Sequence, residues 1–276
     1  MNNGEKSEEN GAEVRKSSPL RSAVINFRVV GAILMREVIT RYGRNNFGVL
    51  WVVGTPLIFT VGVTILWNVY GRHGGHTGIT ITAFAWTGYS TVMIWRNATA
   101  HCGKAVEPNA GLLFHRNVKV VDLIYARSMM EIAGATGSTI VVGLVLMGSE
   151  LIVPPKDVLM MLFGWMLLMW YGFAMGIVVG AMTERFDWFE RLYHPAMYFY
   201  LGISGCFFMV VWLPTYLQRW AVWVPTVTVT EMLRHGYFGN IVVTYERPGY
   251  LCVYNLVTTF IGLLLCKETQ YRIGHE

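Results

Sequence analysis

Residues 158–183 read VLMMLFGWMLLMWYGFAMGIVVGAMT, and this stretch decides the fold. It contains 26 consecutive residues without Asp, Glu, Lys or Arg. A transmembrane helix needs about 20 mostly apolar residues to cross about 30 Å of hydrocarbon. The stretch therefore predicts a helix that spans a membrane.

The composition of the whole chain agrees with a membrane protein. Hydrophobic residues make up 54% of the 276 residues and charged residues only 14%, whereas about a quarter of an ordinary soluble domain is charged. The formal net charge is +5, but apolar runs rather than basic clusters dominate the chain. We therefore expect no nucleic-acid binding.

Five further stretches are apolar and uncharged, and a sixth is too short to span. We predict an all-α polytopic membrane protein with six transmembrane helices. The short stretch, 220–230, predicts a re-entrant element before the last helix, because irregular backbone at membrane depth needs protein or a cavity around it. The other five spans are expected at 47–70, 79–95, 132–149, 192–218 and 248–266.

The distribution of Lys and Arg predicts the orientation. If the spans alternate and the amino terminus is cytosolic, 17 of the 22 basic residues fall on the cytosolic side and 5 on the other. Cytosolic segments carry the excess of Lys and Arg in membrane proteins. We expect a multi-pass membrane protein with both termini in the cytosol.

The amino-terminal part predicts a tail and a surface helix. Residues 1–19 are polar, contain four glutamates and show no signal peptide, so we expect a disordered cytosolic tail. Residues 20–46 predict a basic amphipathic helix in the cytosolic membrane interface, with a helix packed on a partner protein as the alternative. Its apolar stripe consists of Leu20, Val24, Phe27, Gly31, Leu34, Val38 and Tyr42.

Motifs of catalysis and metal binding are absent from the sequence. There is no G-x-x-x-x-G-K-[ST] phosphate-binding loop, no H-E-x-x-H zinc helix and no G-x-S-x-G elbow. The four cysteines lie far apart without a C-x-x-C pair, so neither a disulfide framework nor a zinc site is indicated. We expect no catalytic residues, no metal and no cofactor in this chain.

Arg127 and Glu131 are ionisable residues near the third predicted span. Their i, i+4 spacing predicts a structural ion pair at the cytosolic end of that helix. The alternative is a proton-coupling carboxylate, which would need a further acid or histidine at mid-depth. The sequence favours the ion pair.

Three groups of residues resemble a known family. The sequence is similar to the inner-membrane permeases of the ABC-2 type transporter family that export capsular polysaccharide, over roughly residues 27–272, and 47–276 would form their transmembrane domain. The matching residues are the run 36–43, Gly48, Leu50, Trp51 and Pro56; the run 109–113, Arg116, Val118, Lys119, Asp122, Ala126, Arg127 and Glu131; and the run 225–231.

The resemblance implies an assembly and a cargo. A homodimer of this chain would work with two copies of a separate ABC ATPase, which binds the ATP and Mg that this chain has no motif to hold. Together they would move a lipid-linked polysaccharide, on an undecaprenyl or phospholipid anchor, toward the periplasm. A periplasmic co-polymerase and an outer-membrane export channel would carry it onward.

In the resembled family, cytosolic loops contact the ATPase. Here the candidate segments are 101–121 and 183–194, which mix apolar anchors with charges, as a helix that seats in a partner's groove does. Alternatively the charges only set topology and the aromatics only lie at the membrane interface. The candidate ATPase-coupling residues are Leu112, Phe114, His115, Arg116, Lys119, Phe186, Asp187 and Trp188.

Aromatic residues are candidates for a glycan conduit, because apolar ring faces pack on sugar C–H faces. Tyr193, Tyr200 and Phe207 fall seven residues apart and predict one stripe on the fifth span. Trp51, Phe59 and Trp67 on the first span are further candidates. Plain packing and interfacial aromatic belts are the alternative interpretation.

The segment 214–249 is long for a loop, and long loops are usually functional. We expect short re-entrant helices near the outer leaflet that close or guide the exit, with a loosely ordered periplasmic loop as the alternative. Other cargoes remain open, namely an O-antigen, a teichoic-type glycan or a small lipophilic compound. A membrane scaffold without a transport path is the alternative from a different class.

Overall fold

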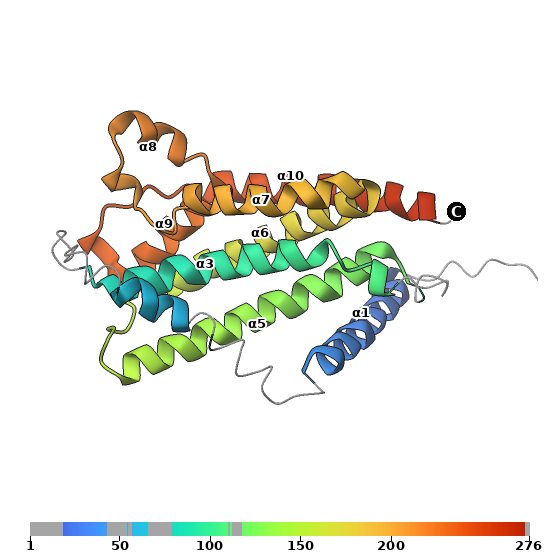
Figure 1. Cartoon of the computed structure of the whole chain (residues 1–276), viewed down its shortest axis with the longest axis horizontal. Helices are drawn as coiled ribbons and strands as arrows, with labels where there is room; N and C mark the ends of the chain where they lie inside the picture. Colours follow the sequence, from blue (N-terminus) through green and yellow to red (C-terminus); the bar gives the residue numbers. More distant parts are fainter. Residues whose placement is uncertain are drawn as a thin grey trace, which may run out of the picture.

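The computed structural model describes residues 19–42, 54, 57–65, 79–109, 111 and 118–273. Every regular element named within these ranges is helical. Figure 1 shows the long helices side by side in one bundle, with α1 and the C-terminal end of α10 at the same end. The elements are α1 (Pro19–Tyr42), α3 (Ile81–Cys102), η1 (Glu107–Asn109), α5 (Val120–Gly148), α6 (Val158–Arg185), α7 (Asp187–Ile203), η2 (Val210–Trp212), α8 (Thr215–Ala221), α9 (Pro225–Phe238), η3 (Gly239–Ile241) and α10 (Pro248–Ile273).

The central helix of the bundle is α6, which packs against α3, α5, α9 and α10. Gly172, Gly176 and Gly180 recur at every fourth position on its buried face. A Cβ atom added at Gly176 would lie 2.8 Å from Oγ of Ser128 and 3.1 Å from Sγ of Cys102. The glycines therefore let α3 and α5 approach the backbone of α6 closely, as small residues do in membrane bundles.

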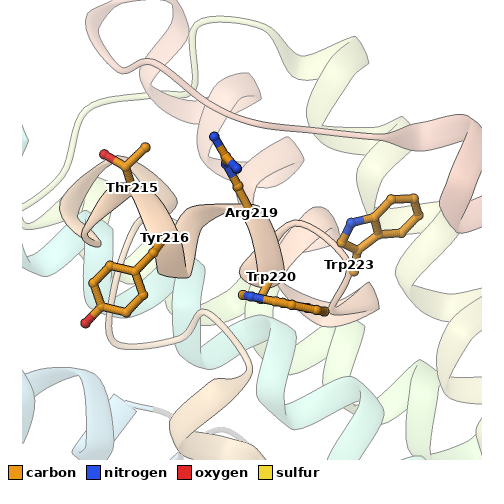
Figure 2. Close-up of a pocket in the computed structure, with 5 residues that line it drawn as sticks. All are labelled: Thr215, Tyr216, Arg219, Trp220 and Trp223. Atoms are coloured by element: carbon orange, nitrogen blue, oxygen red, sulfur yellow. The ribbon is translucent and has the colours of Figure 1, made fainter.

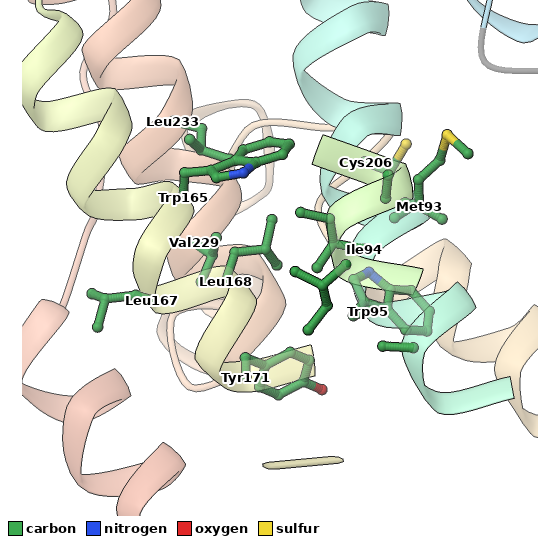
Figure 3. Packing of buried hydrophobic residues seen from close by; sticks show 14 of the residues in the cluster. Met93, Ile94, Trp95, Trp165, Leu167, Leu168, Tyr171, Cys206, Val229 and Leu233 are labelled. Atoms are coloured by element: carbon green, nitrogen blue, oxygen red, sulfur yellow. The ribbon is translucent and has the colours of Figure 1, made fainter. Parts of the chain in front are cut away.

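Large apolar side chains fill the space between α3 and α6. Figure 3 shows Trp165, Leu168 and Tyr171 of α6 near Ile94 and Trp95 of α3. All five side chains are buried. Packed side chains of α3 and α6 therefore form this part of the hydrophobic core of the bundle.

Three described helices, α5, α6 and α10, are long and apolar enough to cross a membrane. The helix α6 contains the predicted span 158–183, and α10 contains the predicted span 248–266. The helix α3 contains most of the predicted span 79–95. The predicted span 132–149 corresponds to α5, but its predicted start is too late, because α5 begins at Val120. The part of the chain that the structure describes is thus all-helical, which agrees with a polytopic membrane protein. Of the first predicted span, 47–70, residues 57–65 are described as helical.

The prediction that the fifth span, 192–218, is one continuous helix is wrong. The helix α7 ends at Ile203. The chain turns at Gly205, whose φ of +83° is a left-handed conformation that glycine adopts readily. Phe207 therefore lies beyond the helix end, and the stripe predicted through Tyr193, Tyr200 and Phe207 does not extend to its third member.

The segment 214–249 forms two short helices, α8 and α9, instead of a loose loop. The predicted boundaries 220–230 are wrong, because α8 ends at Ala221 and α9 begins at Pro225, a residue favoured at the first helical position. All residues of α9 except His235 are buried, against α3, α6 and α10. The depth of these helices in the membrane stays a prediction.

The helix α1, Pro19–Tyr42, covers most of the range 20–46 predicted for an amphipathic helix and begins one residue earlier. Ile33 is buried against the bundle, with Val30 packed beside it. Phe27, Met35 and Ile39 point away from the bundle and are 82%, 58% and 63% exposed. The helix therefore has a second apolar face that the described protein does not cover, and its place in the membrane interface stays a prediction.

Candidate functional site

A group of hydroxyl-bearing side chains lies inside the apolar bundle. The hydroxyl of Tyr200 on α7 lies 3.2 Å from the hydroxyl of Tyr171 on α6 and 3.1 Å from Oγ1 of Thr226 on α9. The ring of Trp95 on α3 meets the Tyr200 ring edge-on, with 5.1 Å between centroids. Buried hydroxyls are normally hydrogen-bonded, and here they bond mainly to one another across helices.

Further aromatic rings continue this group toward α8. The Tyr254 ring lies 6.0 Å from Tyr171, and the Tyr250 ring lies 6.1 Å from Tyr254. Trp223 lies 5.2 Å from Tyr250, and the Tyr250 hydroxyl donates to the Trp223 carbonyl at 2.7 Å. We call the set Trp95, Tyr200, Tyr171, Tyr254, Tyr250 and Trp223 the aromatic row.

At the other end of α7 the aromatic contacts continue toward the predicted cytosolic segments. The rings of Tyr193 and Phe189 are stacked, with 5.7 Å between centroids. Trp188 lies 6.1 Å from Phe189 and is 57% exposed. Tyr193 itself packs against the core that contains Trp95. Aromatic side chains thus follow the length of α7, although not as the single stripe predicted.

Arg234 of α9 is fully buried and fixes the turn after α7. Its guanidinium donates to the carbonyls of Gly205 at 2.8 Å, Cys206 at 2.8 Å and Phe208 at 2.6 Å. It also lies over the Phe84 ring, 3.9 Å from the centroid, in a cation–π contact. An arginine fork matches several carbonyls at once, so this residue determines where the chain leaves the bundle.

Glu231, one turn before Arg234, is buried beside it. Its carboxylate accepts hydrogen bonds from the backbone N–H groups of Val210 at 3.3 Å and Tyr245 at 3.2 Å. The two side chains thus connect α9 to the segments before α8 and before α10.

The two segments predicted to contact an ATPase lie next to each other. Nζ of Lys104 lies 2.9 Å from Oε1 of Glu190. A Cβ atom at Gly103 would lie 3.2 Å from Oγ1 of Thr183. The structure therefore joins residues 101–109 of the first segment to residues 183–194 at the end of the bundle that holds the C-terminal end of α10 (Figure 1).

Glu37 of α1 connects three elements at the same end. Its carboxylate forms an ion pair with Arg127 of α5 and accepts a hydrogen bond from Nδ2 of Asn109 at 3.0 Å. Oε1 of Glu131 lies 3.4 Å from Nδ1 of His101. Arg127 and Glu131 thus each have a partner that the sequence did not predict, and a pair between the two of them stays a prediction.

Several predicted site residues fall on parts of the chain that the structure leaves undescribed. The side chain of Asp187 is among them, whereas Phe59 is described and stacks on Tyr89 with 3.8 Å between centroids. The described Lys119 is exposed, and its N–H donates to Oδ2 of Asp122 at 3.0 Å. Phe186 lies 5.8 Å from Trp188. The residues outside the described ranges are Trp51, Trp67, Leu112, Phe114, His115 and Arg116.

Sequence reasoning missed residues whose partners are distant in the chain. Tyr171 and Tyr254 carry no local signal, because each lies in an apolar stretch among other aromatics. Arg234 and Glu231 do carry one, since two opposite charges three residues apart directly after the apolar stretch 220–230 indicate a buried polar function. Among the described residues, no group of three or more His, Cys, Asp and Glu side chains is placed to hold a metal ion.

Relatives of known description share most of this chain. It is 41% identical to the capsule polysaccharide export inner-membrane protein CtrC of Neisseria meningitidis serogroup A. The alignment spans 251 residues, which are 91% of this chain and 94% of CtrC. The chain belongs to the family of capsule polysaccharide export inner-membrane proteins. The identity to a second member, BexB of Haemophilus influenzae, is 41% over 248 residues, with 90% of this chain and 93% of BexB covered.

A more distant relative of this capsule polysaccharide export protein is the polysialic acid transport protein KpsM of Escherichia coli. The two are 25% identical over 243 residues, which cover 87% of this chain and 93% of KpsM. No family model matches the chain. The resemblance inferred from the motifs is confirmed, and it extends over nearly the full length of each relative.

Proposed function

We propose that this chain is the permease subunit of an ATP-driven ABC exporter that moves lipid-linked capsular polysaccharide across the inner membrane. The observation that carries this proposal is the 41% identity to CtrC over 91% of the chain. The helical bundle supports it, because α5, α6 and α10 are long and apolar enough to span a membrane. The chain itself is not an enzyme; ATP and Mg bind to the partner ATPase.

In this proposal the chain crosses the membrane six times with both termini in the cytosol. Figure 1 supports the alternation, because α3, α5, α6, α7 and α10 run in alternating directions along the bundle. The backbone N–H of Val120, at the start of α5, donates to Oε1 of Gln270, near the end of α10, at 2.7 Å. Since α1 packs against α5, α1 and the C-terminal end of α10 lie at the same end of the bundle (Figure 1).

The permease works as a homodimer with two ATPase subunits. The coupling surface is the end of the bundle where Lys104 and Glu190 join the two candidate segments. Exposed Trp188 is suited to an apolar groove of the ATPase, with Phe186 and Asp187 beside it. Lys119 adds a positive charge at the start of α5. Leu112, Phe114, His115 and Arg116 complete the proposed contact.

The glycan conduit follows the aromatic residues, with Tyr193 and Tyr200 on α7 and Phe59 in the helical segment 57–65. Ring faces pack on sugars while hydroxyl tips bond sugar hydroxyls, so a chain can slide without being fixed. Trp51, Trp67 and Phe207 are further proposed contacts. The short helices α8 and α9 close or guide the exit, where a periplasmic co-polymerase and an outer-membrane channel take over the polymer.

Deletion of the gene, followed by complementation, tests the function. We expect lipid-linked polymer to accumulate in the cytosol of the deletion strain and to reach the surface again when the wild-type gene is restored. Tyr200→Ala should reduce export while the protein still inserts and binds the ATPase, with Tyr198→Ala on the same helix as the exposed control. Unchanged surface polysaccharide in the deletion strain would overturn the proposed function.

A further inference from the structure

The short helix α8 and the turn after it expose three large aromatic side chains around a hollow. Tyr216, Trp220 and Trp223 are 67%, 76% and 53% exposed. Together with Thr215 and Arg219 they line a cavity of about 620 Å³. Figure 2 shows the five side chains spread around this one short segment.

Positive charge accompanies these rings. Arg219 lines the cavity, and the guanidinium carbon of Arg247 lies 4.9 Å from the centroid of the Trp223 ring. Within the ranges that the structure describes, neither arginine has a carboxylate within 4.0 Å. The charge of both arginines is therefore available to an anionic ligand, and arginine binds carboxylates in a bidentate manner.

The cavity adjoins the aromatic row through one shared residue. Trp223 is a member of both, and the Tyr250 hydroxyl fixes the Trp223 carbonyl at 2.7 Å. Figure 1 shows α8 projecting from the bundle at the end opposite to the C-terminal end of α10. A chain that follows the aromatic row outward therefore reaches α8 last.

We propose that Tyr216, Arg219, Trp220, Trp223 and Arg247, the α8 platform, bind acidic sugar residues of the exported glycan where it leaves the permease. The rings pack on sugar C–H faces, and the arginines pair with the carboxylates of the same sugars. This inference rests on the proposed function, because it takes the ligand to be the cargo.

A lipid-facing anchor is the competing explanation for exposed aromatics beside arginine. An anchor requires neither an open hollow lined by these residues nor a connection to the tyrosines of the aromatic row. The α8 platform has both, through its cavity and through the contact of Trp223 with Tyr250. These two observations favour a sugar ligand over a lipid headgroup.

Binding to the full-length chain in phosphatidylcholine nanodiscs tests the α8 platform. The probe is a short oligomer of sialic acid, and a neutral maltooligosaccharide of equal length is the control ligand. We expect the acidic oligomer to bind more tightly than the neutral one, and Trp220→Ala and Trp223→Ala each to weaken its binding about tenfold. Arg219→Gln should weaken binding and reduce its dependence on salt.

Trp170→Ala is the matched control, because Trp170 is also a partly exposed tryptophan but lies on α6, away from α8. It should leave binding of the acidic oligomer unchanged. Equal binding of the two oligomers, or equal binding by wild type, Trp220→Ala and Arg219→Gln, would overturn the proposal. Quenching by brominated phosphatidylcholine that is clearly stronger for wild type than for Trp220→Ala, with no oligomer bound, would assign α8 to the membrane and would also overturn it.

The α8 platform and the proposed function can fail separately. Trapped polymer in the deletion strain together with no oligomer binding would overturn the α8 platform and leave the exporter standing. Oligomer binding that depends on Trp220 and Arg219, with normal capsule in the deletion strain, would support the α8 platform and overturn the exporter.

Discussion

Arg234 is the residue on which the position of α8 depends. Its guanidinium binds three carbonyls of the turn after α7. The same turn needs a glycine opposite it, since a Cβ atom at Gly88 would lie 2.5 Å from the carbonyl oxygen of Cys206. One buried arginine and one close-approach glycine therefore hold the backbone that leads from the bundle to the α8 platform.

Replacing Arg234 tests this at the residue scale. Arg234→Met leaves three buried carbonyls without their donor and removes the positive charge beside the buried Glu231, so we expect the free energy of unfolding to fall by about 3 kcal/mol. Arg234→Lys should restore only part of the loss, because an ammonium group cannot reproduce the planar fork. Thermal unfolding of the purified protein in detergent measures both, and Arg191→Met, at an exposed position, is the control. Equal melting temperatures of Arg234→Met and Arg191→Met would contradict the prediction.

At the scale of elements, the sequence predicts helices better than it predicts their ends. The uncharged stretches at 158–183 and 248–266 lie inside α6 and α10, because length and apolarity are properties of the stretch itself. The end of α7 was missed because it depends on Arg234, 31 residues beyond Ile203 in the numbering. The residues on both sides of the turn are uncharged, so the composition does not show where α7 ends.

The residues of the candidate site also divide into those with a local signal in the sequence and those that depend on contacts distant in the chain. Tyr193 and Tyr200 were found because their spacing of seven fits one helix face, and both contact other aromatic side chains in the structure. Tyr171 and Tyr254 were missed because their relation to Tyr200 exists only after α6, α7 and α10 have packed. Whether these residues line a conduit stays a prediction.

The packing of α6 against its neighbours leads to a prediction about its glycines. A methyl group at position 176 would be too close to Ser128 and Cys102, so Gly176→Ala should destabilise the protein by about 1–3 kcal/mol despite the better helix propensity of alanine. Gly137→Ala on α5 is the matched control, because a Cβ atom there has no described heavy atom within 4 Å. The melting temperature should fall for Gly176→Ala and stay level or rise for Gly137→Ala. A fall of equal size in both variants would show that close packing at α6 is not the cause.

At the scale of the whole molecule, the helices differ in how much protein surrounds them. In the most apolar part of each helix, 56% of the residues of α6 are buried and 22% of those of α10. Along α10, Leu256, Phe260 and Leu264 recur at four-residue spacing and are 50–61% exposed. α10 thus presents an apolar face to its surroundings, where lipid or a second copy of the chain can cover it, whereas α6 is enclosed within one chain.

Thiol labelling of intact cells tests the orientation of this bundle. The four native cysteines are replaced by alanine, and Thr215→Cys on α8 or Lys267→Cys near the end of α10 is introduced; both positions are exposed. Because the excess of Lys and Arg predicts cytosolic termini, a membrane-impermeant maleimide should label Thr215→Cys once the outer membrane is permeable. Lys267→Cys should react only after the inner membrane is broken. The reverse pattern would place α8 in the cytosol, and the aromatic row would then lead toward the ATPase instead of the exit.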